Sequence, residues 1–337
     1  MKTKAQNKVI MITGASAGIG RATAQAFARE GARIGLLARD SERLSAAKEE
    51  VERLGGKGLV LVADVADPDA VEAAAGKLEA EFGPIDIWVN DAMTSVFSPV
   101  HEMTPAEFQR VTEVTYLGYV WGTLAALKRM RPRNKGTIIQ VGSALAYRGI
   151  PLQSAYCGAK HAIRGFTDSL RCELIHDKKD IHICIVEMPA VNTPQFEWVR
   201  SRLWNKAQPV PPIYQPEVAA QAIVYAATAG RREIYVGGPT VEAIVGNKIA
   251  PGWLDHHLAR TGYDSQQTDE PKPLNQPDNL FQPVKGQFGA HGSFDSRSRK
   301  FSVELWLSEH RGVWVTALVI VTAAILVGAF YAKTRGV

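Results

Sequence analysis

Cysteine is scarce in this sequence. The 337 residues include only Cys157, Cys172 and Cys184. Three cysteines without a disulfide or metal-binding spacing exclude a disulfide-stapled secreted domain and suit a reducing compartment. No metal site is predicted either, because the adjacent His256 and His257 would point to different sides of a helix.

An excess of charge of one sign is also missing. Lys and Arg number 39 against 34 Asp and Glu, which gives a formal net charge of +5. The basic residues are scattered rather than gathered in a stripe, so no nucleic-acid partner is expected. The N-terminus lacks the long apolar run of a signal peptide, because the run Val9 to Ile12 ends at a glycine turn.

From residue 8 to about 238, short apolar runs alternate with stretches of helical period. This order is typical of parallel strands joined by crossover helices, so we predict an α/β fold with a doubly wound parallel sheet of the Rossmann type. Helices are expected from Gly20 to Glu30 and after Thr104, where Thr-Pro-Ala-Glu is a helix-start pattern. The predicted strands are 8–13, 33–38, 58–63, 85–90, 136–142, 181–187 and 233–236.

The composition changes after this part of the chain. Residues 264–300 are rich in Gln, Pro, Asp, Gly and Ser and have no sustained apolar period. We therefore predict a catalytic domain over residues 1–262 and a flexible linker over residues 263–311.

A long uncharged run lies near the C-terminus. Residues 313–332 contain twenty uncharged positions, about 30 Å as a helix and enough to cross a hydrocarbon core. We expect a transmembrane helix over 312–333 and a short tail over 334–337. Basic residues before the run favour a single-pass C-terminal anchor with the catalytic domain facing the cytoplasm. A buried core helix is the alternative.

A glycine-rich turn follows the first predicted strand. It reads Thr13-Gly14-Ala15-Ser16-Ala17-Gly18-Ile19-Gly20, and a helix is expected to begin there. Glycines allow backbone N–H groups to approach a pyrophosphate at a helix N-terminus. A glycine-rich turn alone can be a tight turn without a binding role, but its position between a strand and a helix favours a nucleotide site.

A second motif follows the fifth predicted strand. Ser143 precedes Tyr156 by thirteen residues, and Lys160 follows Tyr156 by four. Tyr and Lys at this spacing share one helix face, so an ammonium can lower the phenol pKa from about 10 towards a working value. The alternative is a packed Tyr and a solvated Lys.

Together these motifs resemble the short-chain dehydrogenase/reductase family, in which Thr-Gly-x-x-x-Gly-x-Gly is usual, over roughly residues 6–238. The resemblance implies hydride transfer between nicotinamide and a carbonyl or alcohol. It implies Ser143 as substrate orienter, Tyr156 as general acid/base, and Lys160 as the group that tunes Tyr156. It also implies a set of cofactor-binding residues: Gly14, Ser16, Ile19, Gly20, Asp64, Asn90, Tyr156, Lys160, Val191 and Thr193.

The end of the second predicted strand bears on the choice of nucleotide. NAD-selective members of the family tend to have a carboxylate there, whereas this chain has Ala38 and Arg39. Ala38 leaves room and Arg39 offers a planar, always charged group to a 2′-phosphate, so NADP(H) is the predicted cofactor. The alternative is that Arg39 is solvated and that Asp40 caps the next helix.

Two positions depart from the family's pattern. Thr115 stands where the family often has an Asn that holds a water beside Lys160; a hydroxyl can still hold water, so a less efficient proton relay is expected. Met93 replaces the usual Gly of Asn-Asn-Ala-Gly, and it either narrows the nicotinamide pocket or fills core.

The segment from Pro194 to Tyr214 usually closes over the substrate in this family. Its large apolar residues are Phe196, Trp198, Leu203 and Trp204. They line an apolar pocket, pack within the lid or form a subunit contact. With the predicted anchor, an apolar lid favours a lipophilic alcohol or ketone.

Three classes of function remain open on the sequence. The first is the hydride-transferring enzyme, for which the family implies a homodimer or homotetramer. The second is a catalytically weak NADP(H)-binding sensor or scaffold at the membrane. The third is an epimerase or dehydratase that uses the same cofactor transiently.

Overall fold

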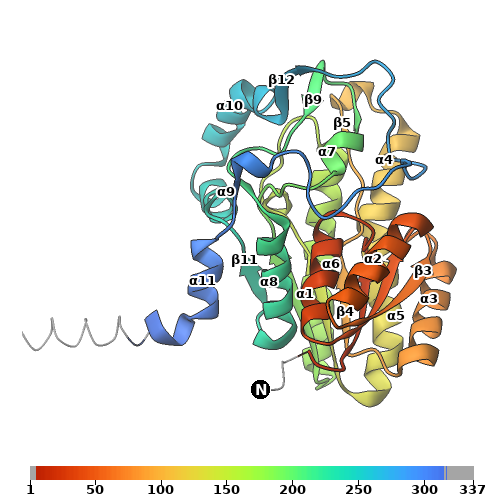
Figure 1. Cartoon of the computed structure of the whole chain (residues 1–337). Coiled ribbons are helices and arrows are strands. Elements are labelled where there is room, and N and C mark those ends of the chain that lie inside the picture. The colour runs from red at the N-terminus through yellow and green to blue at the C-terminus, as the bar shows by residue number, and fades with distance from the viewer. Residues whose placement is uncertain (1–4, 315, 317–337) are drawn as a thin grey trace, which may run out of the picture.

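The computed structural model describes residues 5–314 and 316. In this part of the chain a seven-stranded parallel sheet lies between two layers of helices (Figure 1), in the order β11-β7-β6-β4-β1-β2-β3. Its strands are β1 (Val9–Thr13), β2 (Arg33–Ala38), β3 (Lys57–Val62), β4 (Ile87–Asn90), β6 (Gly136–Val141), β7 (Ile181–Glu187) and β11 (Glu233–Tyr235). The predicted Rossmann-type sheet is confirmed, and each predicted strand matches to within two residues.

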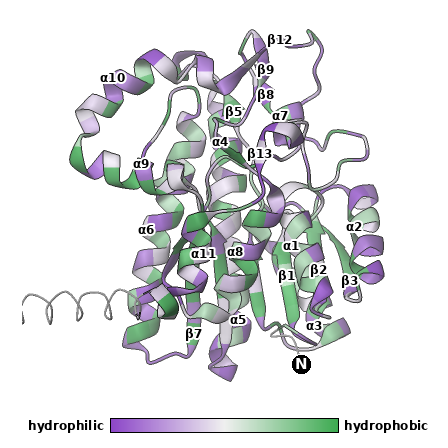
Figure 2. Ribbon diagram, turned by 60° about the vertical axis from the view of Figure 1, so that its left-hand side comes forward, coloured by the Kyte–Doolittle hydropathy of each residue, from purple (hydrophilic) through white to green (hydrophobic). Residues whose placement is uncertain are grey.

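The strands are apolar on both faces because helices cover both faces. In β1, Ile10 and Ile12 belong to one buried cluster, whereas Val9 and Met11 belong to the other. The first cluster includes residues of α1 (Gly18–Arg29), α2 (Ser41–Arg53) and α8 (Pro216–Ala229). The second includes residues of α3 (Pro68–Phe82), α5 (Gly118–Arg133) and α6 (Ser154–His176). Figure 2 shows the sheet strands coloured mainly as hydrophobic.

The strand order reverses beside β1, which pairs with β2 on one side and with β4 on the other. In such sheets a crevice opens outside the carboxyl ends of the strands at this point. The glycine turn and the residues after β4, β6 and β7 meet at this crevice.

The helix predicted after Thr104 begins with the expected capping box. In α4 (Pro105–Thr112), the Thr104 N–H donates to Glu107 Oε2 at 2.8 Å, and the Glu107 N–H donates to Thr104 Oγ1 at 3.3 Å. A π-helical turn, η2 (Glu113–Leu117), then leads into α5 and contains Thr115.

The lid segment and the helices after it complete the upper part of the molecule in Figure 1. The lid contains α7 (Gln195–Trp198), β8 (Arg200–Ser201), β9 (Asn205–Ala207) and β10 (Ile213–Tyr214). The other elements of this part are β5 (Val96–Phe97), α9 (Gly238–Ile249) and α10 (Pro251–Thr261). Strand β5 pairs with β8, which joins the lid to the chain after β4.

The prediction of a flexible linker over 263–311, separate from a domain of residues 1–262, is wrong. This segment contains β12 (Gln267–Pro271), which pairs with β9, then β13 (Ser298–Arg299), which pairs with β10, and α11 (Val303–Glu309). It also contributes buried apolar side chains: Leu280, Val284, Ala290 and Leu305. The polar composition of residues 263–311 was misleading. Backbone N–H and C=O groups of this segment bond to the rest of the fold, and such bonds do not require a periodic apolar face.

The predicted transmembrane helix over 312–333 and the tail over 334–337 lie outside the described residues, apart from 312–314 and 316. Among the helices of the described part, none combines the length and the apolar character that a membrane crossing requires.

Candidate active site

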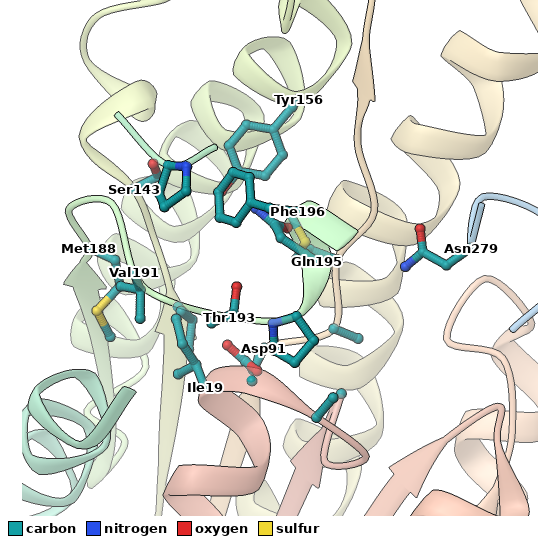
Figure 3. Close-up of a pocket in the computed structure, with 18 of the residues that line it drawn as sticks. Ile19, Asp91, Ser143, Tyr156, Met188, Val191, Thr193, Gln195, Phe196 and Asn279 are labelled. Atoms are coloured by element: carbon teal, nitrogen blue, oxygen red, sulfur yellow. The ribbon is translucent and has the colours of Figure 1, made fainter. Parts of the chain in front are cut away.

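A cavity of about 380 Å³ occupies the crevice at the carboxyl ends of the strands. Both sequence motifs reach it, one from each side, and Figure 3 shows several of their side chains around the same space. The predicted site residues in its wall are Gly14, Ser16, Ile19, Arg39, Asp64, Ser143, Tyr156, Lys160, Val191 and Thr193.

Ser143 and Tyr156 lie on the same side of this cavity, as Figure 3 shows. Ser143 directly follows β6 and Gly142, and Tyr156 lies in the first turn of α6. Burial raises the pKa of Tyr156 above its ordinary value, and the Ser143 hydroxyl acts in the opposite direction. Burial is thus the largest influence on this phenol, and the predicted tuning by Lys160 stays a prediction.

Lys160 is buried one turn farther along α6. Its Nζ donates to the Val141 carbonyl at 2.7 Å and to the Tyr119 hydroxyl at 3.1 Å, and it lies 5.5 Å from the centroid of the Tyr156 ring. Burial lowers the pKa of Lys160 to about 8, although Asp91 and Glu187 act to raise it. The ammonium is therefore fixed beneath the tyrosine by two oxygen partners.

Glu187, the last residue of β7, is a buried carboxylate behind Ser143. Its Oε2 accepts the Ser143 N–H at 2.6 Å, and its Oε1 has no hydrogen-bond partner among the described residues. Burial raises the pKa of Glu187 to about 8 despite the bond from Ser143. Sequence reasoning missed this residue and Tyr119, because both read as parts of apolar elements.

The glycine turn packs closely against the chain after β4. Gly14 has φ of +76° and its Cα faces the backbone of Ala92, where a Cβ would come within 2.9 Å. Next to it, Asp91 lines the cavity, and burial raises its pKa to about 7, opposed by Lys160 and by the Gly20 N–H. A side chain at Gly14 would push the turn off this wall.

Two predicted cofactor residues do not reach the cavity wall. The Asn90 side chain faces the interior, where its Nδ2 donates to Gln140 Oε1 at 2.9 Å and its Oδ1 accepts from Trp88 Nε1 at 2.8 Å. Gly20 packs against the Gly14 carbonyl and the Asp91 carboxylate. Asn90 and Gly20 therefore lie behind the cavity wall, where each contacts other groups of the protein.

The structure also shows the surroundings of Thr115 and Met93, the two residues that depart from the family's pattern. The Thr115 hydroxyl donates to the Thr94 carbonyl at 2.8 Å and accepts from the Thr94 N–H at 3.0 Å, so it does not reach Lys160. The phenol that contacts Lys160 directly is that of Tyr119, and the relay through a water at Thr115 stays a prediction. Met93 lines the cavity, which favours the narrowing interpretation.

Comparison with known proteins agrees with this geometry. Residues 8–203 match the family model described as short chain dehydrogenase. This chain belongs to the short-chain dehydrogenase family.

Three relatives show the extent of the likeness. An uncharacterized oxidoreductase of Bacillus subtilis, YxnA, is 33% identical over 270 residues, which are 80% of this chain and 76% of that protein. The 3-dehydrosphinganine reductase of Danio rerio is 33% identical over 234 residues, 66% of this chain and 68% of that protein. The fatty acyl-CoA reductase of Acinetobacter baylyi is 32% identical over 223 residues, 66% of this chain and 73% of that protein. The chain is thus an oxidoreductase of a family that uses nicotinamide cofactors.

In this short-chain dehydrogenase the nucleotide end of the cavity lies beside β2. Asp40 accepts the Arg43 N–H at 2.8 Å, caps α2 and pairs with the Arg43 guanidinium, and it lines the cavity beside Arg39. Asp64 pairs with the Arg110 guanidinium, and Arg39 lines the same part of the cavity.

The lid of this short-chain dehydrogenase contributes two of the four predicted apolar residues to the cavity. Phe196 and Trp198, both in α7, line it. Leu203 packs in a buried cluster with Phe97 and Phe196, while Trp204 is 91% exposed. The lid therefore combines a pocket wall with its own small core.

Proposed function

We propose that this chain is an NADP(H)-dependent oxidoreductase that transfers a hydride between nicotinamide and the carbonyl or alcohol group of a lipophilic substrate. The supporting observation is that the glycine turn and the group of Ser143, Tyr156 and Lys160 line one cavity. The bound nicotinamide would supply or accept the hydride. The protein's own groups orient the substrate and handle the proton.

The roles follow from the contacts of each group. The Ser143 hydroxyl donates to the substrate oxygen, while the bond from its N–H to Glu187 fixes its backbone. Tyr156 holds its proton, so it is suited to protonate the oxygen of a carbonyl that is being reduced. Lys160, fixed by Val141 and Tyr119, places a positive charge beneath the phenol and stabilises the phenolate formed when the proton leaves.

The residues at the nucleotide end fit a phosphorylated dinucleotide. The glycine turn brings backbone N–H groups and the N-terminus of α1 to the cavity, which suits a pyrophosphate. Arg39 offers a positive charge where a 2′-phosphate would lie, and the nearest acidic residue in sequence, Asp40, is occupied as a helix cap.

The proposed substrate class rests on the apolar wall. Phe196, Trp198, Met93 and Val191 line the cavity, together with the polar Thr193 and Gln195. Two of the relatives are named for 3-dehydrosphinganine and fatty acyl-CoA. A membrane anchor formed by the uncharged run 313–332, with the catalytic domain facing the cytoplasm, would bring such substrates close, and we include it in the proposal.

The test uses the full-length protein and follows NADPH absorbance against a panel of polar and lipophilic carbonyls. Oxidation of NADPH by lipophilic carbonyls is expected, and Tyr156→Phe is expected to abolish it. Tyr225→Phe is the matched control, because its hydroxyl bonds to the Ser308 carbonyl outside the cavity. If NADPH binds and no carbonyl consumes it, the reductase proposal fails. Separation of cell membranes from soluble protein, with and without residues 312–337, tests the anchor.

A further inference from the structure

One segment far from the motifs in sequence crosses the cofactor end of the cavity. We call residues 278–292 the strap. In Figure 1 this blue segment descends past α4 and crosses in front of the sheet between α7 and the tops of α1 and α2. The strap therefore runs over the place where the glycine turn meets the end of β2.

One end of the strap is held by arginine side chains of the nucleotide site. Arg39 donates to the Asn279 carbonyl at 2.6 Å and to the Phe281 carbonyl at 2.9 Å. Arg110 donates to the intervening Leu280 carbonyl at 3.1 Å, and the Leu280 side chain is fully buried. Three consecutive carbonyls thus face two guanidinium groups.

The other end of the strap lies on the glycine turn. The Gly18 N–H donates to the Gly289 carbonyl at 3.1 Å, and Arg21 Nη1 donates to the Phe288 carbonyl at 2.8 Å. Beyond these bonds, Ala290 packs into a small buried cluster with Ala22 of α1 and Ala220 of α8. The strap is therefore anchored on both sides of the pyrophosphate position.

Both ends of the strap also contact the lid. The Phe288 ring lies edge-on to Trp198, with ring centroids 4.5 Å apart, and the Asn279 N–H donates to the Trp198 carbonyl at 3.0 Å. Trp198 itself lines the cavity. The strap and the lid together bridge the opening between the nucleotide side and the substrate side.

The inner side of the strap forms part of the cavity wall. Asn279 and Pro283 line it. Figure 3 shows the Asn279 amide directed into the cavity from the side opposite Met188 and Val191. An amide at this place offers a donor and an acceptor to a polar ligand group.

We propose that the strap is the outer wall of the adenosine half of the cofactor site, that Asn279 contacts the bound adenosine, and that the cofactor enters and leaves only when the strap is displaced. This inference rests on the proposed function. Because Arg39, Arg110 and Gly18 hold the strap through bonds that do not involve the lid, the substrate side can open without releasing the nucleotide. The result is a dehydrogenase in which cofactor exchange is slow.

The main experiment locks the strap reversibly. Ala22→Cys and Ala290→Cys are introduced together in a full-length Cys172→Ser background, since the other two cysteines are buried. Oxidised before loading, the protein is expected to exclude NADP(H); oxidised after loading, it is expected to retain NADP(H) through gel filtration. Reduction should restore exchange in both cases. Equal exchange rates in the oxidised and reduced forms would overturn the strap proposal.

A second experiment decides the matter if the disulfide does not form. Phe288→Ala removes the contact with Trp198 and is expected to speed NADPH dissociation, measured by stopped-flow fluorescence, by about tenfold or more. Gln287→Ala, an exposed neighbour, is the control and should match the unmodified chain. An unchanged rate in Phe288→Ala contradicts the strap.

The two proposals fail in different ways. If the reduced double-cysteine protein binds neither NADPH nor NADH, the proposed function is wrong. If it binds NADP(H) and locking changes nothing, only the strap is wrong. Asn279→Ala adds a direct readout: it should weaken NADPH and NADH by similar factors, because adenosine is common to both, and no weakening of either would remove Asn279 from the site.

Discussion

Glu187 shows how a single buried residue can shape the pH response of the site. Its carboxylate holds the Ser143 N–H and has one oxygen without a partner among the described residues. A charge in this position would be poorly solvated, which is why burial raises the pKa of Glu187 to about 8. The protonated form is therefore the better fit to the folded structure.

The sign of the resulting pH dependence can be worked out. Between its ordinary pKa of 4.5 and about 8, folded Glu187 binds more protons than unfolded Glu187, so stability falls as pH rises through this window. Glu187→Gln removes the ionisation and keeps an acceptor for Ser143. We compare the unfolding free energy of the variant with that of the unmodified chain at each pH. This difference, variant minus unmodified, should increase by more than about 1 kcal/mol from about pH 5 to about pH 9. Urea unfolding at both pH values measures this, and two parallel profiles would contradict it.

Arg39 carries the residue-level prediction on nucleotide choice. Arg39→Ala is expected to reduce kcat/KM for NADPH by roughly 10-fold to 100-fold, because a hydrogen bond to a charged group contributes about 1.5 to 3 kcal/mol. NADH, which lacks the 2′-phosphate, should be affected less. Arg53→Ala in the exposed last turn of α2 serves as the control. An equal loss with both nucleotides would show that Arg39 supports the strap and not the phosphate.

At the scale of elements, the N-terminus of α4 offers a direct test of local structure. Thr104 and Glu107 form the capping box, and Glu107 also accepts from Arg202 at 3.0 Å in the lid region. Thr104→Ala should lower the unfolding free energy by about 1 kcal/mol, and Thr104→Ser should restore most of it. Denaturant unfolding of both variants measures the difference. Equal losses in both would point to the methyl group and not to the cap.

The connection between the strap and α8 responds to pH through His291. Its ring nitrogens contact Asp295 at 2.6 Å and Glu217 at 2.8 Å; burial lowers the pKa of His291, but these carboxylates raise it by more. The stabilisation that charged His291 gains from these two carboxylates is therefore complete below the ordinary pKa of 6.5. It is lost as pH rises through the higher pKa of the folded state. His291→Asn should destabilise the chain at about pH 6 by up to about 1 kcal/mol, since the pair is partly exposed, and by less at about pH 9. Thermal unfolding at the two pH values checks this, and a pH-independent loss would refute it.

Elements differ in how well the sequence predicts them, for physical reasons. Val9 to Ile12 must be apolar on both faces because helices cover both, and the neighbouring central strand β4 shows the same pattern. Residues 278–292 have no such constraint, since their carbonyls bond to arginines that could equally have been solvated. The family resemblance alone assigned Asn90 to the cofactor, whereas its bonds to Gln140 and Trp88 show that its amide faces the interior. Tertiary partners of this kind leave no local pattern.

At the scale of the whole molecule, two truncations separate the strap from the C-terminal run. A chain of residues 1–262 loses the strap and exposes the surfaces that Leu280 and Leu305 cover. It should unfold at a lower temperature and bind NADPH more weakly than the full chain. A chain of residues 1–311 keeps these contacts and should match the full chain in NADPH affinity, as titration would measure. Equal affinity in both truncations would contradict the prediction.

The position of the strap near the end of the chain has a consequence for the order of events during synthesis. Arg39 and Asn279 are 240 positions apart in the chain, and Gly18 is still farther from Gly289. Synthesis proceeds from the N-terminus, so the sheet through β11 can form on the ribosome before the strap has been translated. A nascent chain at that stage has the glycine turn and Tyr156 but lacks the strap over the cavity. If the strap retains the cofactor as we propose, durable cofactor binding follows only after the strap has been translated, and a chain that ends before the strap should not keep its coenzyme.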